Sequence, residues 1–232
     1  MKQIIIYLLA IFGLTSCNQE KTTEENKAVS RVAITTNHIP LPDKLPTTVL
    51  DCSTVEFKSA KQQADTLLWY FGKKRLADDE KFFCAFPNSF AGMQNVFGFD
   101  ARSGLAPLGD NGIVIPYFAQ LNSIPKEIYY NKYINICIDG IWQADNIREA
   151  FGFAGRLTND TEAACFSLSK RTNQEIKSVF HFIFDGHHPK NEYNKEIYSS
   201  LLPRVIKQNI RLGKLLTESY SEVLSEDDGH GH

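Results

Sequence analysis

Apolar residues recur at the spacing of an α-helix in several windows of this chain. Most of these windows are bounded by residues that favour helix ends. Serine, asparagine and aspartate favour helix starts because their side chains accept hydrogen bonds from the first free backbone N–H groups, and glycine favours helix ends. An apolar stripe at helical spacing that is bounded by such residues predicts a helix more strongly than amino-acid composition does. The first of these windows begins after Ser59. The second begins after Asn88 or Ser89 and ends at Gly98, and the third begins after Asp145 and ends at Gly155.

Two further helical segments are expected toward the C-terminus. Thr172 and Glu175 have the spacing of a capping box, and Gly186 is placed to end the helix that they begin. A longer apolar stripe covers residues 191–224. Pro203 should kink this helix or mark a new first turn, because proline lacks an N–H and its ring clashes with the preceding turn.

One segment gives a competing signal. Residues 134–140 read Ile-Asn-Ile-Cys-Ile-Asp-Gly, and apolar alternation into Asp-Gly is typical of a β-hairpin. Residues 180–186 have the same pattern, but Pro189 would disrupt a returning strand. We therefore expect a mainly α, single-domain helical bundle or array, and leave open a short β-hairpin near residues 134–142.

A short internal echo also occurs. Phe97–Arg102 and Phe151–Arg156 both read FGFxxR. A duplicated helical hairpin would produce this echo, and so would chance in a chain rich in aromatic residues.

The N-terminal segment has a different character. Lys2 precedes an apolar run, Ile4–Leu14, which is followed by Thr15-Ser16-Cys17. As a helix this run would span roughly 16 Å, against about 30 Å of bilayer hydrocarbon, so it fits a cleaved export signal better than a membrane span. The sequence Leu14–Cys17 resembles the lipobox of bacterial lipoproteins.

This resemblance covers residues 1–17 and implies cleavage before Cys17, acylation of Cys17 and anchoring by its acyl chains. By the same resemblance, Asn18 after the cysteine favours the outer membrane, with the protein facing the periplasm or the cell surface. Residues 18–27 contain almost no apolar side chain and cannot bury enough surface to fold. We therefore expect a signal peptide (1–16), lipidated Cys17 with a flexible tether (17–50), a helical domain (51–225) and a disordered acidic, histidine-containing tail (226–232).

Four cysteines follow Cys17, namely Cys52, Cys84, Cys137 and Cys165. In an oxidising compartment an even number permits two disulfides in three connectivities. The last three lie in apolar runs, where a free cysteine behaves as a small buried hydrophobic residue. The sequence is therefore consistent both with disulfides between these cysteines and with buried free thiols.

The charge distribution argues against a nucleic-acid partner. The chain has a net charge of −2, and residues 51–216 carry only +2 without a basic run of the kind that binds phosphate backbones. The tail supplies the acidic excess.

The densest group of functional residue types is the segment Asp185–Glu192. Asp185, His187 and His188 are candidate ligands of a divalent metal, because imidazole and carboxylate suit zinc or iron. His188, Asp185 and Glu192 are the candidate catalytic residues. The alternative is a loop whose side chains bond the free backbone groups of two helix ends. The motifs HExxH, GxSxG and GxGxxG are absent, so we predict no cofactor, with a metal at this loop as the alternative.

A cluster of phenylalanines is a second candidate for a functional feature. Six phenylalanines lie between residues 82 and 99; most should be core, and a subset could line an exposed groove with the loop 99–111 as a rim. The sequence thus favours a non-catalytic envelope module that binds a protein, peptide or glycan. One version is an immunity-type protein that neutralises a toxin from a neighbouring cell. The alternative is an envelope hydrolase, metal-dependent or not, centred on Asp185–Glu192.

Overall fold

The computed structural model describes residues 50–53, 55–73, 75–111, 113–141, 151–186 and 190–226. The chain divides into two units, Met1–Thr47 and Thr48–His232, and every described residue belongs to the second. The expected signal peptide, Cys17 and nearly all of the tether lie outside the described residues. The same holds for all of the expected tail except its first residue.

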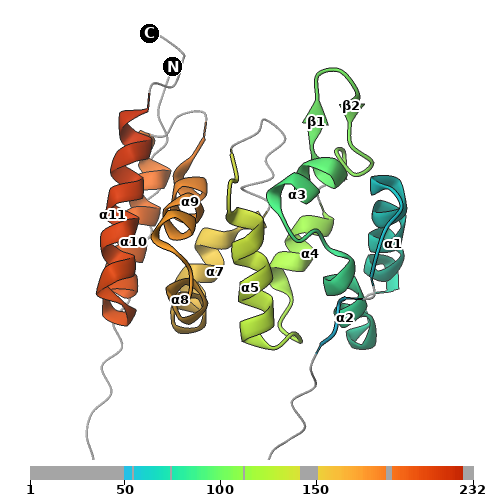
Figure 1. Cartoon of the computed structure of the whole chain (residues 1–232), viewed down its shortest axis with the longest axis horizontal. Coiled ribbons are helices and arrows are strands. Elements are labelled where there is room, and N and C mark those ends of the chain that lie inside the picture. Colours follow the sequence, from blue (N-terminus) through green and yellow to red (C-terminus); the bar gives the residue numbers. More distant parts are fainter. Residues whose placement is uncertain are drawn as a thin grey trace, which may run out of the picture. The chain divides into compact units, whose positions relative to one another are not determined.

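The described domain is mainly helical, as the capped stripes predict (Figure 1). Its helices follow one another across the domain in chain order, which makes it an array. Neighbours pack together: α1 on α2, α5 on α8, and both α9 and α10 on α11. The helices are α1 (Ala60–Lys73), α2 (Leu76–Ala85), α3 (Phe90–Phe97), α4 (Val114–Gln120), α5 (Lys126–Cys137), α7 (Phe153–Asn159), α8 (Thr161–Ser169), α9 (Asn173–Phe184), α10 (Glu192–Gln208) and α11 (Ile210–Ser225).

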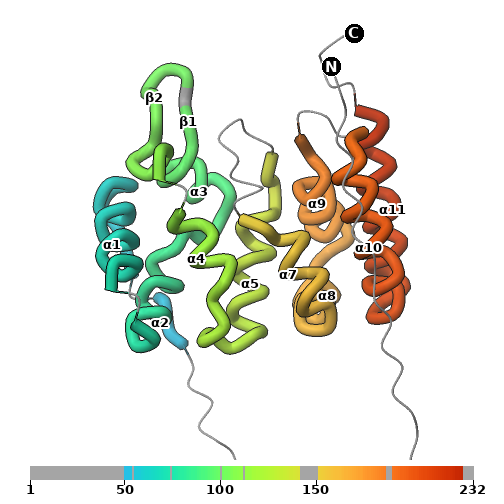
Figure 2. Tube along the Cα trace, turned by 180° about the vertical axis from the view of Figure 1, so that it is seen from behind, coloured from blue at the N-terminus to red at the C-terminus, as the bar shows by residue number. Residues whose placement is uncertain are grey.

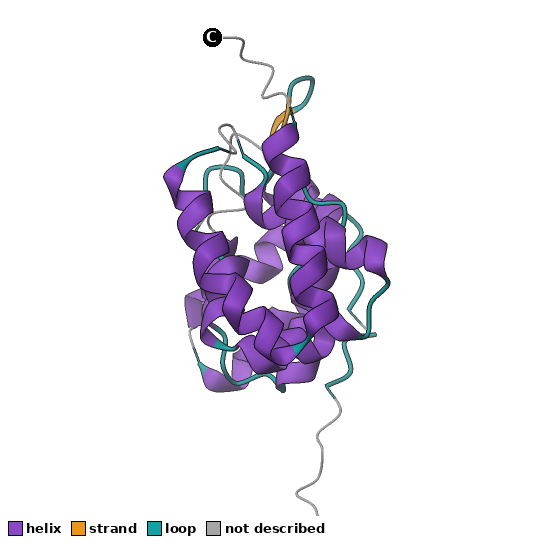
Figure 3. Ribbon diagram, turned by 90° about the vertical axis from the view of Figure 1, so that its left-hand side faces the viewer, coloured by secondary structure: helices purple, strands orange, loops and turns teal. Residues whose placement is uncertain are grey.

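The described strands form one hairpin, β1 (Phe99–Asp100) and β2 (Gly104–Leu105). Figure 3 shows it in orange at one edge of the helices. Among the described residues, no helix combines the length and the apolar character needed to cross a membrane.

The core between α2, α4 and α5 consists largely of aromatic rings. The ring of Phe118 stacks on that of Phe86 with centroids 4.0 Å apart, and Tyr133 lies against Phe151 at 4.1 Å. Aromatic side chains bury the largest area per residue, so this cluster accounts for much of the hydrophobic stabilisation. Five of the six phenylalanines of the run 82–99 are buried here, and Phe99 is the exception.

Several predicted caps are confirmed. Ser89 accepts a hydrogen bond from the backbone N–H of Gly92, and Thr172 and Glu175 form both bonds of the capping box. The helix that they begin covers residues 173–184, as its sequence predicts. It ends at Asp185, whose backbone is extended (φ −59°, ψ 137°), so Gly186 is not needed as a left-handed cap.

The described part of the segment 134–142, residues 134–141, does not form the hairpin strand that its alternation suggested. Residues 134–137 are the last turn of α5, and the turn after it contains Asp139 at φ 57°. The alternation misleads because α5 is enclosed on several sides, with Tyr133, Ile134, Ile136 and Cys137 all fully buried. A helix with such surroundings needs apolar residues on most of its faces and loses its 3.6-residue signature.

The C-terminal helical stretch breaks at Asn209 and not at Pro203. Pro203 lies inside α10 on its exposed side, where water can bond the carbonyl that lacks a partner. Asn209 has an extended backbone (φ −159°, ψ 114°), and its side chain accepts a hydrogen bond from the N–H of Leu212. It therefore ends α10 and starts α11.

The two FGFxxR copies fold differently. In the first, Gly98 ends α3 and Phe99 enters β1. In the second, Gly152 has φ 62° and precedes α7, so Gly155 lies within a helix that it was expected to end. Residues 142–150, where the expected helix begins, lie outside the described residues. The shared sequence therefore does not produce a repeated structure.

Candidate functional site

The hairpin carries two apolar side chains on one exposed face. Phe99 pairs directly with Leu105, so their side chains lie side by side, and they are 57% and 51% exposed. Gly104 permits the tight turn, because its backbone has φ 82°, in the left-handed region that favours glycine. The sequence pointed to this loop as a rim but gave no sign that it would pair as strands.

Backbone hydrogen bonds hold the hairpin against the end of α3. The N–H of Ala106 donates to the carbonyl of Gly98 (2.9 Å), and that of Leu108 to the carbonyl of Val96 (2.8 Å). Leu108 is buried and fixes the return segment to the core. The apolar face is thus supported by rigid structure.

A cavity of about 460 Å³ lies between the hairpin and the last turns of α3. This volume is within the range of ligand pockets, and its walls are more polar than apolar. None of the described residues that line it has a titratable side chain. It is lined mainly by Gln94, Asn95, Phe99, Ser103, Leu105 and Pro107.

The structure describes only part of the predicted site at 185–192. His187 and His188 lie outside the described residues. Asp185 ends α9, and its backbone N–H donates a hydrogen bond to the carbonyl of His181. Glu192 is exposed in the first turn of α10, and its Oε2 lies 3.3 Å from Nζ of Lys195. Asp185 and Glu192 therefore lie at the end of α9 and the start of α10, where the side chain of Asn191 accepts a hydrogen bond from the N–H of Asn194. Among described residues, no group of three or more His, Cys, Asp or Glu is arranged to hold a metal ion.

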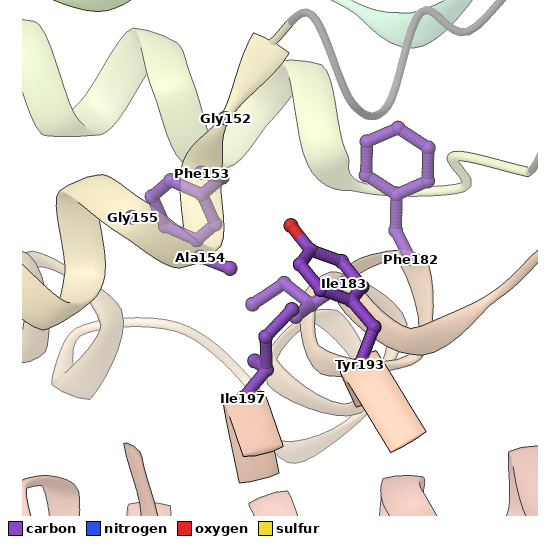
Figure 4. A pocket seen from close by; sticks show the side chains of 8 residues that line it. All are labelled: Gly152, Phe153, Ala154, Gly155, Phe182, Ile183, Tyr193 and Ile197. Atoms are coloured by element: carbon purple, nitrogen blue, oxygen red, sulfur yellow. The ribbon is translucent and has the colours of Figure 1, made fainter. Parts of the chain in front are cut away.

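A small cavity lies beside this loop. Its volume is about 50 Å³, room for little more than a water molecule. Figure 4 shows the phenol ring of Tyr193 between Phe182 and the glycine-rich start of α7. No described carboxylate or imidazole lines the cavity, so neither Asp185 nor Glu192 contributes to it.

The buried carboxylates lie elsewhere and have structural partners. Asp79, in the first turn of α2, accepts hydrogen bonds from the hydroxyls of Tyr117 and Ser123, both at 2.7 Å. Burial and the bond to Asp79 raise the pKa of Tyr117 to about 12. The hydrogen bond from Arg75 lowers the pKa of Asp78. Asp78 and Asp79 thus lie in the first turn of α2, where the helix dipole favours negative charge.

The cysteines also have structural roles. Cys52 and Cys84 form a disulfide, whereas Cys137 and Cys165 are free and buried. Burial raises the pKa of the Cys165 thiol to about 12, and it also raises the pKa of the Cys137 thiol well above its usual value. A thiol needs a lowered pKa to act as a nucleophile near neutral pH, so neither is suited to catalysis.

Comparisons of the chain with protein-family models, with curated proteins and with solved structures find no match.

Proposed function

We propose that this protein is a lipid-anchored envelope protein whose helical domain binds a partner through the hairpin groove without catalysing a reaction. The groove comprises Phe99, Leu105 and the cavity beside them. The observation that carries the proposal is the exposure of this paired apolar face beside a cavity of about 460 Å³. Exposed apolar side chains on a rigid support are characteristic of interaction sites. The partner is an envelope protein, peptide or glycan, and an immunity-type role is one version.

The anchor rests on Leu14–Cys17. Mass analysis of the mature N-terminus should find an acylated Cys17, and Cys17→Ser should move the protein from the outer-membrane fraction to the soluble envelope fraction. An unmodified N-terminus upstream of residue 17 would contradict the anchor.

The binding role is tested by comparing two exposed apolar residues. Cross-linking of the full chain in its own envelope should yield a partner that is lost with Phe99→Ser. Ile141→Ser is the matched control, because Ile141 is 54% exposed and does not line the cavity. Truncation of a central contact residue typically weakens binding by about 1–2 kcal/mol or more, roughly tenfold. Equal losses in both variants would count against the groove.

The same preparation tests the hydrolase alternative. Metal analysis and an assay on envelope polymers should be run beside His188→Ala. Turnover that disappears in this variant would replace the binding proposal with an enzyme centred on Asp185, His188 and Glu192.

A further inference from the structure

The helix ends at one side of the domain form a continuous row, which we call the lower edge from its place in Figure 1. It comprises the turn between α1 and α2, the loop between α4 and α5, the junctions on both sides of α8, and the turn between α10 and α11. Hydrogen bonds join these loops, so they remain side by side. Three such bonds run from Ser123 to Asp79, from Lys126 to Asp160 and from Arg211 to the carbonyl of Ser169.

The described chain begins at this same edge. Leu50 lines a cavity with Tyr70 of α1 and Lys81 of α2. Figures 1 and 2 show the blue start of the chain at the lower edge and the hairpin at the opposite edge. Leu50 follows Cys17 by 33 residues. The composition of residues 18–49 predicts a flexible tether, and a flexible segment of that length has a root-mean-square extension of about 30 Å. On that prediction, a lipid on Cys17 would keep the lower edge near the bilayer.

Basic side chains lie along the lower edge. Lys126, Lys170 and Lys207 are exposed there, and Lys73 is half-buried. Lys126 and Lys170 are neutralised by Asp160 and Glu127, so the positive charge of the edge comes mainly from Lys73, Lys207 and Arg211. These basic side chains complement an anionic surface.

Exposed apolar side chains lie toward both ends of the edge. Trp69 and Leu76, at the turn between α1 and α2, are 63% and 75% exposed, and Ile210, at the turn between α10 and α11, is 79% exposed. Nζ of Lys73 lies 4.2 Å from the centroid of the Trp69 ring. Tryptophan beside lysine suits the membrane interface, where the indole lies at headgroup depth and the ammonium reaches phosphate.

We propose that the lower edge rests on the anionic phospholipid surface to which Cys17 is anchored, with the hairpin facing away from it. The location depends on the lipid anchor of the proposed function, whereas the affinity of the edge for phospholipid does not. A short tether gives a millimolar effective concentration, so weak contacts of the edge suffice to orient the domain.

The test uses the mature chain from residue 17 with Cys17→Ser, so that acylation cannot contribute. Trp142→Phe in this chain leaves Trp69 as its one tryptophan. Vesicles of phosphatidylglycerol and phosphatidylcholine should co-sediment with the protein and shift Trp69 emission to the blue. Vesicles of phosphatidylcholine alone should do neither. Binding should weaken with added salt, because screening reduces the attraction of exposed charges.

Two pairs of substitutions locate the contact. Lys73→Gln with Lys207→Gln should weaken binding about thirtyfold, because each basic residue near an anionic surface contributes roughly a factor of five. Phe99→Gln with Leu105→Gln, at the opposite edge, should leave it unchanged. The inference is overturned if the protein does not bind anionic vesicles or binds neutral vesicles equally well. It is also overturned if only the variant with Phe99→Gln and Leu105→Gln loses vesicle binding. Failure of Cys17 acylation in cells would leave these vesicle results intact and remove only the anchor.

Discussion

At the residue scale, the most unusual side chain is Lys132, which is buried in α5 with 6% exposure. Its Nζ donates to the carbonyls of Phe83 and Phe86 at the end of α2 and lies 4.5 Å from the centroid of the Phe83 ring. A cation at a helix C-terminus compensates the free carbonyls and the dipole. Burial opposes the charge and lowers the pKa of Lys132 to about 7. No cavity described above reaches this amine, so its role is structural.

This burial predicts a pH dependence of stability. Between pH 7 and about 10.5 the unfolded chain keeps the Lys132 proton and the folded chain loses it, so the free energy of unfolding rises with pH. The gain from pH 7 to pH 9 should be on the order of 2 kcal/mol, measured by urea denaturation. Lys132→Met should remove most of the slope, and exposed Lys126→Met should keep it. Equal slopes in all three chains would show that Lys132 is not the cause.

At the element scale, α10 and α11 form an antiparallel pair whose close approach depends on Gly213. A methyl group at this position would overlap with Cγ1 of Ile206 and lie 3.3 Å from its Cα. Gly213 is buried in the first turn of α11 and faces the end of α10. The absence of a side chain therefore sets the distance between the two helices at their turn.

Gly213→Ala should destabilise the domain by about 1 kcal/mol or more, although alanine is the better helix former by about the same amount. Ile206→Ala should restore most of the loss in the double variant, because it removes Cγ1. Thermal unfolding of the four chains gives the coupling energy. If Gly213→Ala stabilises the protein, the close approach does not limit this turn.

At the scale of the whole molecule, the disulfide between Cys52 and Cys84 ties the segment before α1 to α2 across 32 residues. Cross-linking a loop of this length removes conformational freedom mainly from the unfolded chain. It thereby stabilises the first helices at the end of the array, which have neighbours on fewer sides than the central helices.

Replacing both cysteines with alanine should lower the free energy of unfolding by about 3–4 kcal/mol. In the Cys17→Ser chain, a thiol reagent should find two free thiols, Cys137 and Cys165, and only after unfolding, because both are buried. Cys137→Ala serves as the control, since it should reduce the thiol count by one and leave the disulfide intact. Four reactive thiols, or none, would contradict this pairing.

The helical class and many helix ends were predictable because their signals are local. Ser89, Thr172 with Glu175, and Asn191 each bond backbone groups within three residues of their own position, so sequence spacing alone reveals them. The candidate site was predictable only as a glycine-rich rim at 99–111. The pairing of Phe99 with Leu105, and the cavity beside them, depend on how the loop docks on α3.

Sequence by itself determined the mainly α class and most capped helix starts, and it predicts an export signal because Leu14–Cys17 resembles a lipobox. Tertiary structure alone decided that α5 runs through 134–137, that the C-terminal helices part at Asn209, that Cys52 pairs with Cys84 and that Lys132 is buried. The physical reason is the range of the interactions. Caps and turns act within a few residues, whereas enclosure, disulfide geometry and burial of charge depend on segments that only the folded chain brings together.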